Sequence, residues 1–269
     1  MEAARFIALL GEVLNFSTEE IYALVGVFTR IGAMAALLPG FGEQTLPTRI
    51  RLGAAVAFAL IVWPLVRDDA VGAWSGSSID SVSLTAVILA EAAAGLLIGL
   101  SIRLLVMALQ LAGSIAAQAT AVAQIFGAGV TPDPMPAIGN FLTVAGITLA
   151  LVMGLHVKVT VVLMDSYSVI PFGGFSRPDD IAMWGVSRAS AAFALAFSIA
   201  APFVVASLLY NLALGAINRA MPQLMVALVG APAITGLMLF LLWASAPIAL
   251  AHWAGVLDRV LLDPFGDVE

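Results

Sequence analysis

Long apolar runs separated by short polar or Gly- and Pro-rich segments dominate this sequence. The runs cover residues 21–38, 52–66, 81–117, 141–164, 181–209 and 224–255. Most approach or exceed the ~20 apolar residues with which a helix crosses a bilayer, although the second run has only about fifteen and contains Pro64. The pattern predicts an all-α, polytopic membrane protein with six to seven long helices and a central broken loop.

Polar residues and breakers set the expected boundaries. A short amphipathic helix is expected at residues 5–15, and Ser17 followed by Glu19 and Glu20 predicts the N-cap of the next helix. Residues 81–117 form either one long tilted helix or two helices joined near residue 100. Pro202 predicts a kink in the fifth run, and a polar acidic tail is expected at 257–269.

The central segment 118–140 separates the third and fourth runs and is expected to be an open loop. Gly127, Gly129 and three prolines, the last of them Pro136, exclude a regular helix there. Unpaired backbone at membrane depth is tolerated only under protein or along a watery cavity. The loop therefore either closes a conduit or lies buried in the subunit core. Its candidate gate residues are Ile125, Phe126, Gly127, Gly129, Val130 and Met135.

Composition identifies the environment. Of 269 residues, 62% are hydrophobic and only 10% charged, and the mean hydropathy is +1.07. Soluble domains carry about 25% charged residues, so this is an integral membrane protein, and the whole chain is expected to form a single membrane-embedded domain. The net charge of −6 argues against nucleic acid as a partner. No cleavable signal peptide is expected at the N-terminus.

Three charges interrupt the apolar runs. Arg30, Glu91 and Arg103 are expected to be buried or to form intersubunit pairs, because a charge facing lipid costs a few kcal/mol. Glu91 and Arg103 lie about 18 Å apart along one straight helix, so each needs a partner on another segment. Lys158 and Arg219 fit snorkelling near helix ends.

The remaining motifs give no enzyme chemistry. His156 and His252 lack the carboxylates or nucleophiles that a metal site or a catalytic constellation requires, so no cofactor and no enzymatic activity are expected. The GxxxG of Gly95 and Gly99 permits close helix packing, either inside the subunit or between subunits.

Three stretches resemble the family of the flagellar biosynthetic protein FliR, the R subunit of the type III secretion export gate. Residues 202–236 carry the most specific match, with Asn211, Gly215, Arg219, Pro222, Gln223, Gly230 and Pro232 in the family's spacing. The second stretch contains Arg30-x-Gly32, Pro39, Pro47 and Arg49-x-Arg51. The third runs from Gln110 through Phe141-Leu142 to Gly154-x-His156 and Ile170-Pro171.

The resemblance implies a noncatalytic subunit of the flagellar export gate in the bacterial inner membrane, at the basal body. Its implied partners are FliP-like and FliQ-like gate subunits, FlhB-like and FlhA-like export components, unfolded flagellar substrates and membrane lipid. In the family, the loop that matches residues 118–140 plugs the central channel until secretion begins. Some helices then lie against partner subunits rather than lipid, partly above the bilayer plane.

Three alternatives stay open at this point. A small-molecule transporter predicts inverted repeats and paired helix breaks, whereas the sequence has one conspicuous central break with no clear partner in the other half. An intramembrane enzyme requires convergent polar residues. The homologous subunit of a virulence injectisome would share most of the same motifs.

Overall fold

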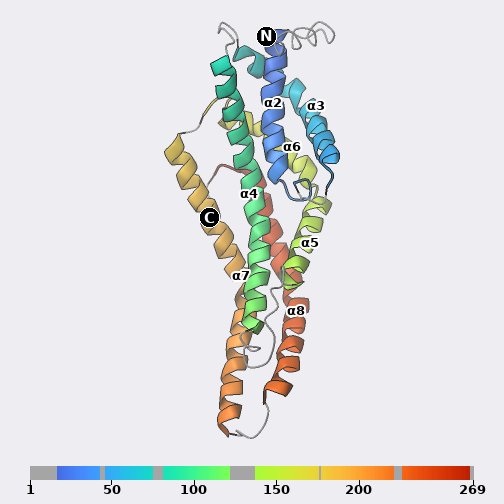
Figure 1. Ribbon diagram of the computed structural model, residues 1–269, viewed down its shortest axis with the longest axis vertical. Coiled ribbons are helices and arrows are strands. Elements are labelled where there is room, and N and C mark those ends of the chain that lie inside the picture. The colour runs from blue at the N-terminus through green and yellow to red at the C-terminus, as the bar shows by residue number, and fades with distance from the viewer. Residues whose placement is uncertain are drawn as a thin grey trace. The chain divides into compact units, whose positions relative to one another are not determined.

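The computed structural model describes residues 17–42, 46–74, 81–121, 137–175, 177–220 and 226–266. Within these ranges all regular structure is helical, which confirms the expected all-α fold. The helices are α2 (Thr18–Leu37), α3 (Thr48–Gly72), α4 (Ser81–Ala121), α5 (Ala137–Val152), α6 (Leu155–Val169), α7 (Pro178–Ala220) and α8 (Val226–Leu262) (Figure 1).

Five of these helices are long and apolar enough to cross a membrane, and α5 with α6 forms one further, broken candidate span. α4 has 41 residues and α7 has 43. At 1.5 Å per residue each is roughly 60 Å long, about twice the thickness of the hydrocarbon core. The polytopic fold is confirmed, and the longest helices exceed what a single crossing needs.

The start of α2 follows the sequence prediction closely. The Ser17 hydroxyl accepts a hydrogen bond from the backbone N–H of Glu20, and the Glu20 carboxylate accepts one from the N–H of Ser17. This reciprocal capping box satisfies two of the N–H groups that a helix start leaves without partners.

Several expected helix ends are wrong, because prolines and short polar stretches interrupt these helices less than expected. α3 continues through Pro64 to Gly72, α7 continues through Pro202 to Ala220, and α8 contains two prolines and ends at Leu262. Proline removes one backbone donor. In α3 the helix continues past Pro64, with buried Val62, Trp63 and Val66 on either side of it. The tail expected from residue 257 therefore begins after Leu262.

The expected central loop is also shorter than its predicted limits. α4 is one continuous helix that ends at Ala121, and α5 begins at Ala137. Residues 122–136, and with them all six candidate gate residues, lie outside the described part of the chain. The short helix expected at residues 5–15 lies outside it as well.

Gly154 breaks the helix that the sequence predicted over residues 141–164. Its φ is +80° and its ψ is +36°, a left-handed conformation that costs a side-chain-bearing residue about 1–2 kcal/mol. α5 ends at Val152, and α6 starts at Leu155 with Gly154 as its N-cap. The break separates the apolar run into two helices of 16 and 15 residues.

Contacts divide the chain into two compact units. The first contains residues 1–103, 154–185 and 260–267, and the second contains 104–153, 186–259 and 268–269. In the second unit, Gly113 of α4 meets the backbone of Gly139 in α5, an approach that leaves no room for a Cβ. The indole Nε1 of Trp253 donates a 2.8 Å hydrogen bond to the carbonyl of Leu105, which fixes α8 against α4.

Candidate functional site: a buried charge network

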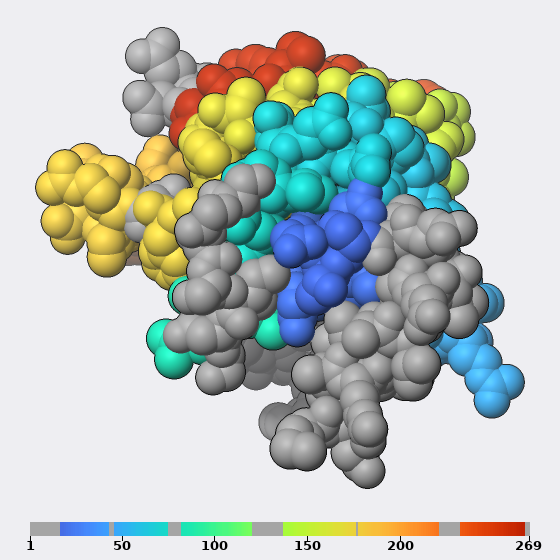
Figure 2. Space-filling view, turned by 90° about the horizontal axis from the view of Figure 1, so that it is seen from above, coloured from blue at the N-terminus to red at the C-terminus, as the bar shows by residue number. Residues whose placement is uncertain are grey.

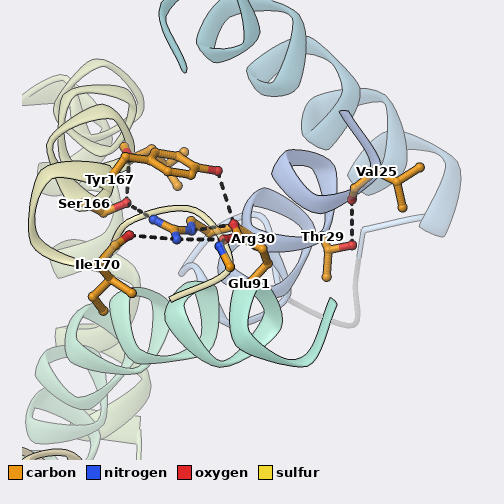
Figure 3. A network of polar contacts seen from close by, with 9 residues as sticks. Val25, Thr29, Arg30, Glu91, Ser166, Tyr167 and Ile170 are labelled. Atoms are coloured by element: carbon orange, nitrogen blue, oxygen red, sulfur yellow. Dashed lines mark hydrogen bonds and ion pairs between the residues drawn. The ribbon is translucent and has the colours of Figure 1, made fainter. Parts of the chain in front are cut away.

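Arg30 lies in the middle of α2 and is fully buried. Its Nε donates to Glu91 Oε2 at 2.8 Å, and its Nη2 donates to Glu91 Oε1 at 3.0 Å (Figure 3). Nη1 donates to the Ser166 hydroxyl and Nη2 to the Ile170 carbonyl, both at 3.0 Å. The guanidinium also lies 3.7 Å from the ring centre of Tyr167, a cation–π contact. Four directed N–H bonds and one aromatic face therefore surround this cation.

Glu91 of α4 is the matching anion and is also fully buried. Besides the two bonds from Arg30, its Oε1 accepts from the backbone N–H of Gly173 at 2.8 Å. Its Oε2 accepts a longer, 3.4 Å bond from the Tyr167 hydroxyl. The pair is bidentate, which is the strongest geometry available to arginine and carboxylate. The carboxylate is thus compensated by both charge and hydrogen bonds in a site without water access.

Two small residues of α4 let the helices approach closely enough for this pairing. Gly95 lies one turn after Glu91 on the same face, and a Cβ on it would collide with the backbone carbonyl of Arg30. A Cβ on Gly99 would lie 2.8 Å from the Met34 carbonyl, again in α2. Between the two uses that the sequence left open for GxxxG, the structure shows packing within the subunit.

Residues at the C-terminal end of α6 provide further hydrogen-bond partners for Arg30 and Glu91. Ser166 and Tyr167 lie in its last turn, and Ile170 is its C-cap. The C-terminus of a helix carries partial negative charge, which favours the nearby guanidinium. The following loop is held against α2, because a Cβ on Gly26 would lie only 2.5 Å from the ring of Phe172.

The network connects α2, α4, α6 and the loop after α6 through groups far apart in sequence. Removing one partner of such a buried pair costs about 3–5 kcal/mol, because the other charge is left uncompensated. A second ion pair, between Glu20 of α2 and Arg67 of α3, lies in the same unit. There the Arg67 side chain is 49% exposed, and exposed pairs contribute far less. Of these two ion pairs, the buried one therefore contributes more to the stability of the first unit.

The other predicted site residues are distributed along the helices. Arg103 is half-buried in α4, and Arg219 is exposed in α7. Asn211 donates a 3.4 Å hydrogen bond to Ser207 one turn earlier in α7, and Gly215 faces open space. Gly230 and Pro232 belong to α8. Pro222 and Gln223 lie outside the described residues.

Sequence reasoning did not find the groups that complete the network. Ser166 and Tyr167 stood at an expected helix end, and the backbone groups of Ile170 and Gly173 leave no side-chain signal. One indication was available: Arg30 and Ile170-Pro171 both belong to the family motifs. Among the described residues no group of three or more His, Asp or Glu is placed to hold a metal ion.

Fold and network together define a polytopic helical membrane protein whose first unit is held by a buried ion pair. Comparison with known proteins specifies it further. The sequence model of bacterial export proteins, family 1, matches residues 21–260. The chain is 34% identical over 255 residues to the flagellar biosynthetic protein FliR of Caulobacter vibrioides, covering 91% of this chain and 96% of that protein.

Two further relatives carry the same name. FliR of Bacillus subtilis is 30% identical over 220 residues, which is 78% of this chain and 80% of that protein. FliR of Aquifex aeolicus is 28% identical over 238 residues, which is 86% of this chain and 88% of that protein. The chain belongs to family 1 of the bacterial export proteins, the FliR family. This membership implies a component of the flagellar export apparatus.

Proposed function

We propose that this chain is a noncatalytic subunit of the flagellar type III export gate, where it forms the secretion channel together with FliP-like and FliQ-like subunits. The observation that carries the proposal is the FliR-family match across residues 21–260. Unfolded flagellar building blocks pass through this channel during assembly of the flagellum. The gate lies in the inner membrane at the basal body and contacts FlhB-like and FlhA-like export components.

Helix lengths and exposure support an assembly of this kind. α4 and α7 are about twice as long as a bilayer crossing requires, so parts of them extend beyond the hydrocarbon. α8 presents large exposed apolar side chains, including Leu239, Phe240, Trp243 and Ile248. Large apolar side chains exposed together on one helix require lipid or a partner subunit to cover them.

The segment 118–140 is the proposed plug of the channel. Ile125, Phe126, Val130 and Met135 supply apolar side chains that exclude water and thereby raise the barrier to ions. Gly127 and Gly129 give the backbone freedom to move when a polypeptide passes. The family resemblance and the composition support this role.

Deletion of residues 124–130 tests the plug. The assembled gate carrying the deletion is expected to leak ions at rest, measured as dye-reported ion flux in vesicles or as cell sensitivity to small toxic solutes. Deletion of residues 75–80 is the control, because it leaves α3 and the buried Trp74 in place. Unchanged ion flux after the central deletion would remove the plug role while leaving the export role standing.

A transporter of small molecules is the alternative from another class. Purification from native membranes distinguishes the two: copurification with P- and Q-type subunits supports the gate, whereas a lone chain that moves a solute in vesicles supports the transporter. The relatives named above are flagellar proteins, which favours flagellar over injectisome membership.

A further inference from the structure

A groove of about 260 Å³ lies between α2 and α3 in the first unit. It is lined only by apolar side chains, namely Leu24, Val25, Phe28, Val56, Ala59 and Leu60. Residues 38–47 join the two helices, which pack side by side and run in opposite directions (Figure 1). In the space-filling view, α2 in blue likewise lies beside α3 in cyan (Figure 2). Val25, Val56 and Leu60 are exposed, so the groove opens to the surroundings of the protein.

The groove continues toward Arg49 at the start of α3. At 100° per residue, Val56 and Leu60 lie within about 20° of the direction of Arg49 around the helix axis. Gly53 lies between Arg49 and Val56 along α3, about 40° from the direction of Arg49, and a Cβ on it would meet open space. On α2, Gly32 lies one turn beyond Phe28 toward the same end and is equally open. An uncovered path of two glycines therefore leads from the groove to one arginine.

The depth of these residues matches that of a phospholipid. Arg49 and Arg67 bracket the apolar part of α3 and are about 27 Å apart along the helix, close to the ~30 Å of the hydrocarbon core. A bilayer core that spans this stretch places Arg49 at the level of the lipid headgroups, with Val56 and Leu60 about 10–16 Å deeper, along the length of an acyl chain. The first turn of α3 contains no acidic residue and has no side-chain cap, so its positive helix end adds to the arginine charge.

We propose that this groove binds an anionic phospholipid, whose phosphate contacts Arg49 and whose acyl chain follows Gly53 and Gly32 into the apolar groove. The lining carries no polar group to pair with a polar partner. Among the described residues of α3, Arg49 and Arg67 lie on the groove face at opposite ends, and Arg67 already pairs with Glu20. One lipid with a negative headgroup would cover the apolar lining with its acyl chain and pair with Arg49 through its phosphate. A helix of a partner subunit in the groove is the competing occupant.

Lipid titration of the full chain in its detergent-purified assembly tests the proposal. Dioleoyl phosphatidylglycerol is the probe, dioleoyl phosphatidylcholine is the headgroup control, and native mass spectrometry counts the retained lipids. Arg49→Gln is expected to weaken phosphatidylglycerol binding about fivefold, the effect of about 1 kcal/mol per basic residue. Arg51→Gln removes the same charge from the opposite side of the same turn and is expected to change binding by less than about twofold.

A second variant tests the acyl path independently of charge. Gly53→Leu places its Cβ in open space, fills the path with its side chain, and is expected to weaken dioleoyl phosphatidylglycerol binding. Gly185→Leu, also in open space on a helix, is the matched control and should bind as the wild type does. Melting temperatures of all variants verify that they fold.

Four results would overturn the proposal. They are equal retention of the two lipids by the wild type, equal loss for Arg49→Gln and Arg51→Gln, wild-type binding by Gly53→Leu, and no saturable binding by the wild-type assembly. The last result is the one expected if a partner helix occupies the groove.

Discussion

Replacing Glu91 by glutamine tests the buried network directly. The change keeps the size of the side chain and removes its charge. Glu91 accepts four hydrogen bonds, two from Arg30 and one each from Gly173 and Tyr167. A glutamine has only one carbonyl oxygen, and its NH₂ group would take the place of the other carboxylate oxygen. That NH₂ group would then face hydrogen-bond donors instead of accepting from them. The Arg30 cation would then lie buried without an anion.

The expected loss is about 4 kcal/mol. Removing one partner of a buried ion pair costs about 3–5 kcal/mol, and hydrogen bonds to a charged group contribute about 1.5–3 kcal/mol each. A loss of about 4 kcal/mol changes the unfolding equilibrium roughly a thousandfold. For a protein of this size it lowers the melting temperature by roughly 10 °C.

Thermal and denaturant unfolding of the detergent-purified protein measures this loss. A double-mutant cycle with Arg30→Gln is expected to give a coupling of at least about 2 kcal/mol, because two amides can pair with each other. Exchange of the two charges, Arg30→Glu with Glu91→Arg, is expected not to restore stability. The exchange would place a carboxylate against the Ile170 carbonyl and a guanidinium against the Gly173 N–H. Near-wild-type stability of Glu91→Gln, or full rescue by the exchange, would refute this reasoning.

Three further changes separate the contributions of packing, backbone and surface charge. Gly95→Leu should destabilise the protein by about 2–4 kcal/mol, since the added side chain pushes α4 away from α2. Gly32→Leu meets open space and should leave the melting temperature nearly unchanged. Equal effects of the two changes would contradict the close packing of α4 against α2 at Gly95. Gly154→Ala should cost about 1–2 kcal/mol because of the positive φ, and an unchanged denaturation midpoint would show that the break does not need glycine. Arg67→Gln should lower the melting temperature far less than Glu91→Gln, because the Arg67 side chain is half exposed. A decrease of the same size would mean that the exposed pair stabilises the protein as much as the buried pair does.

The sequence predicted the elements whose causes are local. The start of α2 depends on Ser17 and Glu20, three residues apart, and apolar length alone indicates the spans. Helix continuation past Pro64 depends on packing around it, and a positive φ at Gly154 cannot be distinguished by pattern from the other glycines of a chain that has 24. Local signals therefore gave the fold class and most helices, while boundaries set by tertiary packing were missed.

The buried site was predictable only in part, for a related reason. Arg30 and Glu91 are conspicuous because charges in apolar runs need compensation. The sequence contains no indication that they compensate each other, since they lie 61 positions apart on different helices. Two of the four groups that complete the network are backbone groups, at Ile170 and Gly173, whose positions depend on how α6 ends. Such groups become visible only once the helices are packed.

An export assay tests the central claim most directly. In a strain lacking this chain, flagellar building blocks should be absent from the culture medium, and the wild-type gene should restore them. The variant Glu91→Gln should restore export weakly, in proportion to the amount of assembled gate measured in the same membranes. Normal secretion of flagellar subunits by the strain without this chain would contradict its role in the export gate.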